Sequence, residues 1–218
     1  MLAAVLWDMD GLMVDTEPTW TIAEEELAAH LGGVWSEQLK AVIVGTRLDV
    51  AVPLILEHYG REATPDQVAE ASDWLLGRMV ELFASEIRLL PGVATLMADL
   101  EQRGIPQALV SSSYRVLVDS VLAHGLGPFA TTVAGDEVEH GKPHPEPYLT
   151  AASRLGVDPR DCVVLEDSSA GILSAEAAGC AAVAVPSVAG VSFLPGPRRE
   201  VRASLAEVDV ELLARLLG

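Results

Sequence analysis

Short, mostly apolar runs recur along the chain and are separated by glycine or polar residues. These runs lie at residues 3–7, 107–110, 131–134, 162–165 and 181–185. A continuous apolar run of four or five residues predicts a strand that is buried on both faces, as in a parallel sheet.

Between these runs, apolar residues recur at spacings of three and four, which predicts amphipathic helices. The expected helices lie at about residues 93–104, 114–124, 145–156, 168–179 and 210–217. Strands that alternate with helices favour right-handed crossovers and helices on both faces of the sheet. The predicted fold class is therefore α/β, with a Rossmann-like, doubly wound parallel sheet.

Residues 16–86 differ from the rest of the chain because they show helical spacing and no strand pattern. Thr16 is the predicted N-cap of their first helix, and a proline-containing capping box at residues 64–67 begins another. We expect an inserted, all-helical cap domain at 16–86 and a core formed by 1–15 and 87–218. Because the insert follows the first strand, it is placed to cover the carboxyl edge of the sheet.

The charge balance limits the classes of partner. The chain has 14 basic and 32 acidic residues, a net charge of −18, which argues against binding to nucleic acid or anionic membranes. No apolar run approaches the roughly 18 residues of a membrane span, and the N-terminus lacks a signal-peptide pattern. We expect a cytoplasmic protein in which Cys162 and Cys180 are buried, free thiols.

Two carboxylates, Asp8 and Asp10, follow the first predicted strand and precede Gly11. In an extended backbone their side chains point the same way, so their charges need compensation. Mg2+ commonly binds one or two carboxylates together with substrate phosphate oxygens. The alternative is a solvated strand end with two surface acids.

Three further polar groups follow later strands or loops, and each has an ordinary structural alternative. Ser111 to Ser113 suit a phosphate, or form an N-cap cluster. Lys142, within a Gly-Lys-Pro-His-Pro stretch, can place a charge on a phosphate or between carboxylates, or is an exposed loop lysine. Glu166 and Asp167 would share the sheet edge with the first two acids, or simply favour a helix N-terminus.

In their order and placement, these four groups resemble the motifs of haloacid dehalogenase superfamily phosphatases, and the resemblance covers nearly the whole chain. The matching stretches are residues 8–17, Ser111, residues 141–145 and residues 166–168. The helical insert is similar to the cap of the phosphoglycolate phosphatase and beta-phosphoglucomutase group. Residues 15–18, 45–49 and 90–93 look similar to its hexitol- and sugar-phosphate phosphatases.

The resemblance implies a role for each motif residue. Asp8 would be the nucleophile that forms an aspartyl-phosphate, and Asp10 the general acid and base. Mg2+ would be held by Asp8, the Asp10 carbonyl and Asp167, with Glu166 in or just outside its shell. The transferring phosphoryl group would be held by Ser111, the Ser112 backbone and Lys142.

The cap would then select the remainder of the substrate, with Glu17, Trp20, Thr46 and Arg47 as the candidate contacts. Trp20 also fits the apolar face of its helix, and Arg47 also fits a solvated loop. The resemblance implies a Mg2+-dependent phosphomonoester hydrolase acting on a small phosphorylated metabolite such as a sugar or polyol phosphate, as a monomer or weak homodimer.

The alternatives are a beta-phosphoglucomutase-like phosphosugar mutase and a non-catalytic binding module. Trp20 stands where the mutase branch commonly has a histidine, which disfavours the first. Asp10 argues against carbon–halogen cleavage, because the dehalogenase branch lacks this second aspartate.

Overall fold

A computed structural model describes residues 1–43, 45–85, 87–187 and 192–218. Its central element is a six-stranded sheet in the order β3-β2-β1-β4-β5-β6, and every neighbouring pair is parallel. The strands are β1 (Ala4–Trp7), β2 (Gln107–Val110), β3 (Thr131–Val133), β4 (Cys162–Glu166), β5 (Ala181–Ala184) and β6 (Arg199–Val201).

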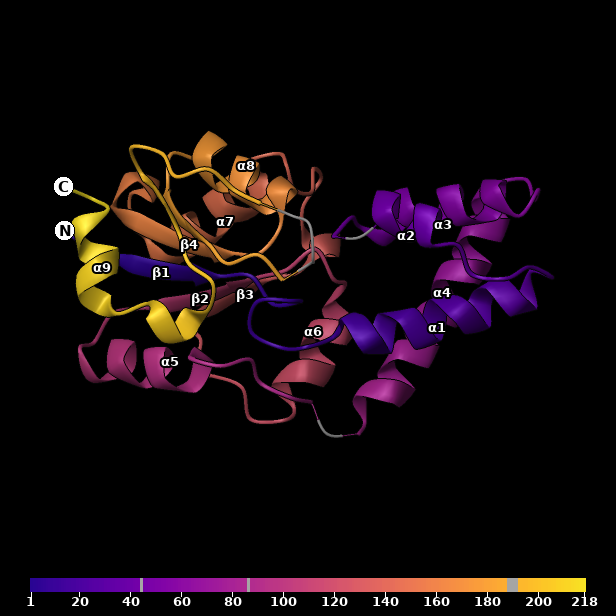
Figure 1. Ribbon diagram of the computed structural model, residues 1–218, viewed down its shortest axis with the longest axis horizontal. Coiled ribbons are helices and arrows are strands. Elements are labelled where there is room, and N and C mark those ends of the chain that lie inside the picture. The colour runs from indigo at the N-terminus through magenta and orange to yellow at the C-terminus, as the bar shows by residue number, and fades with distance from the viewer. Residues whose placement is uncertain (44, 86, 188–191) are drawn as a thin grey trace.

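Helices cover both faces of this sheet, because side chains on successive strand residues point to opposite sides. Val5 and Trp7 of β1 belong to one hydrophobic cluster, while Ala4 and Leu6 belong to the other. In Figure 1, α7 (Glu146–Leu155) and α8 (Ser169–Ala177) lie on one side, and α5 (Val93–Gln102) and α9 (Val210–Arg215) on the other. The α/β, doubly wound prediction is confirmed.

The edge strand β6 is the one strand of the described residues that the sequence did not predict. It has three residues, two of them charged, and all three are only half-buried. Its pairing with β5 places Arg199 beside Ala182 and Val201 beside Ala184. Such a short polar segment carries no apolar run, so only the neighbouring strand defines it.

Four helices lie between β1 and α5, and we refer to them as the cap (Figure 1). They are α1 (Glu17–His30), α2 (Glu37–Ile43), α3 (Leu48–His58) and α4 (Pro65–Phe83). α4 packs against α1 and α3 and buries Leu75 and Met79 between them. The described residues of the cap contain no strand. The boundary expected at 86–87 includes residue 86, which lies outside the described residues.

The two chain segments that join cap and core run side by side. The Asp15 amide donates to the Arg88 carbonyl at 3.1 Å, and the Leu90 amide donates to the Met13 carbonyl at 2.9 Å. The cap is therefore attached to the core by a paired, two-stranded connection next to the carboxyl end of β1.

Two simpler expectations concern the cysteines and membrane spans. Cys162 and Cys180 are free and buried, as predicted. Among the described residues, no helix combines the length and apolar character needed to cross a membrane.

Candidate active site

A cavity of about 380 Å³ lies between the carboxyl edge of the sheet and the cap. Its core end is formed by residues that follow β1, β2 and β4 and by the loop before α7. These polar residues are Asp8, Asp10, Ser112, Ser113, Lys142, Asp167 and Ser168. Parallel strands end at the same edge of a sheet, which is why segments distant in sequence meet here.

Lys142 connects two of the acids at the core end. Its Nζ atom donates to Asp8 Oδ1 at 2.5 Å, to Glu166 Oε1 at 2.7 Å and to the Val110 carbonyl at 3.0 Å. The lysine and both carboxylates are almost completely shielded from solvent. These contacts satisfy all three donors of the ammonium group and fix its position beside Asp8.

Glu166 is held by donors on both carboxylate oxygens. Tyr148 Oη donates to Oε1 at 2.9 Å in addition to Lys142. The Asp167 amide, the Ser168 amide and Ser168 Oγ all donate to Oε2 at 2.9 Å. Gly171 is required beside this carboxylate, because a Cβ there would lie 1.6 Å from Oε1. Glu166 is thus a fixed anchor for the Lys142 ammonium group.

Asp10 is positioned by three hydroxyl groups. Thr16 Oγ1 donates to Oδ1 at 2.7 Å, and Ser113 Oγ and Ser111 Oγ donate to Oδ2 at 2.8 and 3.2 Å. Thr16 occupies the N-cap position of α1 as predicted, but its side chain makes no capping bond. The turn after β1 brings Asp10 within reach, so the hydroxyl binds this carboxylate instead.

Asp167 completes the group of acids and lies beside the turn after Asp10. A Cβ on Gly11, whose φ is +76°, would lie 2.3 Å from Asp167 Oδ2, so the close approach requires glycine. Ser187 Oγ also donates to that oxygen. Single ligand atoms from Asp8, Glu166 and Asp167 all lie within 4.8 Å of one another. This oxygen-rich arrangement suits a hard divalent cation.

The pKa values of the acids at this end show how burial and neighbouring charges act on them. Burial raises the pKa of Asp8 well above its usual value, and Lys142 offsets this only partly. Burial and the nearby Glu166 charge raise the pKa of Asp167 to about 7. Burial acts in the same direction on Glu166, but the Lys142 charge and hydrogen bonds outweigh it and lower its pKa. One lysine therefore does not neutralise the group.

The cap end of the cavity is mostly apolar but contains two carboxylates, Glu17 and Glu24 of α1. Glu17 forms an ion pair with Lys40 at 3.5 Å. Glu24 is 7% exposed, its Oε2 atom has no hydrogen-bond partner among the described residues, and burial raises its pKa to about 7. Among the described lining residues, Lys142 is the only lysine or arginine.

The four cap residues singled out from the sequence have different positions. Glu17, Trp20 and Thr46 line the cavity, and Trp20 also packs against the hydrophobic cluster. Arg47 is not among the lining residues. Its Nη1 donates to the Val138 and Glu139 carbonyls of the core at 3.0 and 3.3 Å, and its Nε donates to Asp49 at 2.9 Å.

This placement of Arg47 differs from the predicted substrate contact. A Cβ on Gly141 would lie 2.5 Å from Arg47 Cδ, so the arginine stem packs directly on the loop that carries Lys142. In this arrangement, Arg47 links the cap to the core.

Two residues that form the site, Glu24 and Tyr148, were not singled out from the sequence, although they line the cavity or bond its acids. Ser113 was included in the three-serine group but was given no individual role, and it bonds Asp10. Glu24 is one of three consecutive glutamates on α1, and only the packing of α1 distinguishes it from its exposed neighbour Glu25.

Comparisons with known proteins agree with this geometry. The family model of haloacid dehalogenase-like hydrolases matches residues 2–179. Hexitol phosphatase B of Escherichia coli K12 is 32% identical over 219 residues, which cover 99% of this chain and 94% of that protein. The bifunctional riboflavin kinase/FMN phosphatase of Arabidopsis thaliana is 32% identical over 212 residues, but the match spans 96% of this chain and 55% of that protein.

A solved structure shows the same architecture with a ligand. It is a mutant of CbbY from Rhodobacter sphaeroides in complex with xylulose-1,5-bisphosphate. Its sequence is 28% identical to this chain, and the match has a TM-score of 0.87 over 98% of this chain and 99% of that one. From its family match, its relatives and its fold, the chain belongs to the haloacid dehalogenase-like hydrolases and is a phosphatase of that family.

Proposed function

We propose that this phosphatase hydrolyses sugar or polyol monophosphates through an aspartyl-phosphate on Asp8. The observation that carries the proposal is the asymmetry of the cavity. Its core end gathers groups that handle a phosphoryl group. Its cap end is lined by two carboxylates and by no described lysine or arginine, and the nearby Lys40 is paired with Glu17. The relative named hexitol phosphatase B, similar over nearly its whole length, supports the same substrate class.

In the proposed reaction, Asp8 attacks the phosphorus atom and the bond to the substrate oxygen breaks. Asp10 donates a proton to the leaving oxygen and then removes one from the water that hydrolyses the aspartyl-phosphate. Lys142, Ser111 and Ser112 hold the transferring phosphoryl oxygens. The hydroxyl donors around Asp10 keep its carboxyl group in place for both proton transfers.

The acids at the core end fit Mg2+, with Asp8, Asp167 and the Asp10 backbone carbonyl as the proposed ligands. Burial, and to a lesser extent the neighbouring acids, raise the pKa values of Asp8 and Asp167, and a bound cation would stabilise their charged forms. When bound, Mg2+ supplies the charge neutralisation that lets a carboxylate approach a phosphate ester. We place Glu166 outside the ligand set, because both of its oxygens already accept hydrogen bonds.

The cap end explains the proposed preference for a substrate whose non-phosphate part is neutral and hydroxylated. A buried carboxylate oxygen without a partner is costly, and a substrate hydroxyl would satisfy Glu24. A second phosphate would instead face Glu24 and a Glu17 whose cation, Lys40, is already paired, while Arg47 is engaged by the core loop. Like charges at close range disfavour such a ligand.

The test is phosphate release from a substrate panel with Mg2+, comparing hexitol phosphates with xylulose 1,5-bisphosphate. We expect kcat/KM to be higher for the hexitol phosphates. The CbbY complex makes a bisphosphate the second candidate. A higher kcat/KM for the bisphosphate would contradict the proposed role of the acidic cap.

The mutase alternative requires a different distribution of charge in the cavity. A phosphosugar mutase must hold a phosphate at each end in turn, and the acidic cap end disfavours this. Interconversion of hexose 1- and 6-phosphates, followed by phosphorus NMR, would reveal mutase activity. Release of inorganic phosphate without interconversion supports the hydrolase.

A further inference from the structure

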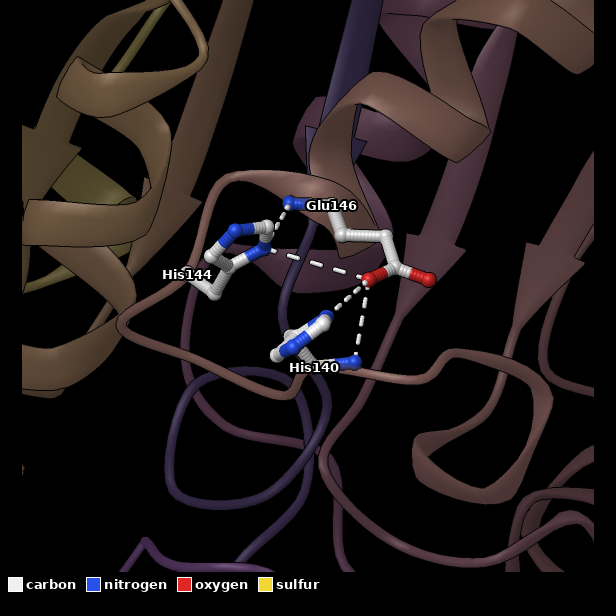
Figure 2. A group of neighbouring side chains, drawn as sticks. All are labelled: His140, His144 and Glu146. Carbon is white, nitrogen blue, oxygen red and sulfur yellow. Dashed lines mark hydrogen bonds and ion pairs between the residues drawn. The ribbon is translucent and has the colours of Figure 1, made fainter.

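The loop that carries Lys142 also presents a second cluster, formed by His140, His144 and Glu146. Figure 2 shows both imidazole rings beside the Glu146 carboxylate. Glu146 Oε2 lies 3.1 Å from His140 Nδ1 and 3.9 Å from His144 Nδ1. The ring centroids are 4.6 Å apart, and single ligand atoms from all three residues lie within 4.8 Å of one another.

These side chains are held by the surrounding backbone. The Glu139 and His140 amides donate to the Glu146 carboxylate at 2.8 and 2.9 Å, and the Glu146 amide donates to His144 Nδ1 at 3.3 Å. Ser174 Oγ donates to the His144 carbonyl at 2.6 Å and fixes that part of the loop. Ligands oriented in this way lose less freedom when a metal binds.

The cluster is also accessible and has no part in the proposed hydrolysis. The His140 and His144 side chains are 56% and 50% exposed, so an ion and its water can reach them from solvent. None of the three residues lines the cavity described above.

We propose that His140, His144 and Glu146 bind a transition-metal ion of the Zn2+ class, with water completing the coordination. Two imidazoles and one carboxylate form a donor set typical of Zn2+, whereas Mg2+ prefers oxygen ligands. Tetrahedral Zn2+ requires ligand atoms about 3.4 Å apart. The two distances from Glu146 Oε2 to the Nδ1 atoms, 3.1 and 3.9 Å, bracket that value. On metal binding, His144 Nδ1 exchanges its hydrogen bond from the Glu146 amide for the ion.

Metal binding at this cluster also affects the loop that carries Lys142. Residues 141–143, which include Lys142, lie between the two histidines. A metal held by both histidines closes this segment into a ring and restrains the backbone that places Lys142 beside Asp8. The bound ion therefore stabilises the loop in the conformation that the active site requires.

Isothermal titration calorimetry of the full chain with Zn2+, in excess Mg2+, tests the proposal. We expect one Zn2+ site that is weakened at least about tenfold in His140→Ala and in His144→Ala. His58→Ala is the matched control, because His58 is exposed on α3 in the cap. Asp167→Asn distinguishes Zn2+ bound to the active-site acids, since the proposed site would survive that change.

Two further measurements do not depend on the alanine variants folding. Bound Co2+ should broaden the NMR signals of the His140 and His144 rings before those of His58. Zn2+ should also slow amide exchange across residues 139–146. Equal Zn2+ affinity in the wild type and both histidine variants, or broadening that favours other histidines, would overturn the proposal.

Discussion

The core and cap ends of the cavity differ in how fully their polar groups are satisfied. At the core end, Lys142 is held by three acceptors and Glu166 by five donors. At the cap end, Glu24 keeps a buried oxygen with no partner among the described residues. The core end is thus preorganised around a group that every phosphate ester shares. The cap end retains hydrogen-bonding capacity for the part of the substrate that varies.

Replacing the nucleophile at the core end should have the largest effect. Asp8→Asn removes the attacking carboxylate oxygen, and we expect kcat to fall by at least about 10⁴-fold on every substrate. Phosphate release under saturating substrate measures this. Asp73→Asn, an exposed change on α4, is the matched control and should retain full activity. Substantial turnover by Asp8→Asn would rule out the aspartyl-phosphate mechanism.

Removing the lysine should affect both chemistry and stability. Lys142→Met leaves Asp8 and Glu166 buried without their shared cation, and we expect kcat to fall about 10² to 10³-fold. The free energy of unfolding should fall by about 3–5 kcal/mol, measured with urea near neutral pH. An unchanged unfolding midpoint would show that other groups compensate the two carboxylates.

At the cap end, Glu24 should make stability depend on pH. Burial raises its pKa from 4.5 to about 7, so between these values the folded state binds more protons than the unfolded state. Its contribution to stability is therefore complete below pH 4.5 and is lost as pH rises toward 7. The loss should be on the order of 3 kcal/mol in the wild type and absent from Glu24→Gln.

Urea unfolding of the wild type and of Glu24→Gln, each at pH 5 and pH 8, measures the pH-dependent contribution of Glu24 to stability. Asp8 and Asp167 also have raised pKa values, but they contribute equally to both proteins, so the difference isolates Glu24. Parallel pH profiles for the wild type and Glu24→Gln would show that Glu24 is ionised and paired in solution.

The smallest effect should appear in substrate discrimination. Glu24→Gln weakens the proposed acceptor for a substrate hydroxyl, and we expect kcat/KM for hexitol phosphates to fall about tenfold. Activity on p-nitrophenyl phosphate should stay the same, because that ester has no hydroxyl groups to bind. Glu25→Gln is the control, since Glu25 is exposed beside it on α1. An equal loss on both esters would place the effect at the core end instead.

Much of the core could be predicted because its signals are local. Buried parallel strands require continuous apolar runs, and the residues after them share one sheet edge whatever the loops between them do. This is why Asp8 and Asp167 could be grouped before their distances were known, whereas Lys142, which lies in a loop, was added through the resemblance to a known family. The edge strand β6 gave no such signal, because its three residues form a strand only through pairing with β5.

Taken alone, the sequence determined the α/β alternation, the helical insert and the residues at the strand ends, because each depends on periodicity or on immediate neighbours. Only the tertiary structure decided where the cap side chains point. Arg47 bonds carbonyls 91 and 92 positions away, and Glu24 rather than Glu25 faces the cavity. Both outcomes depend on how the cap packs against the core, and local spacing contains no information about that contact.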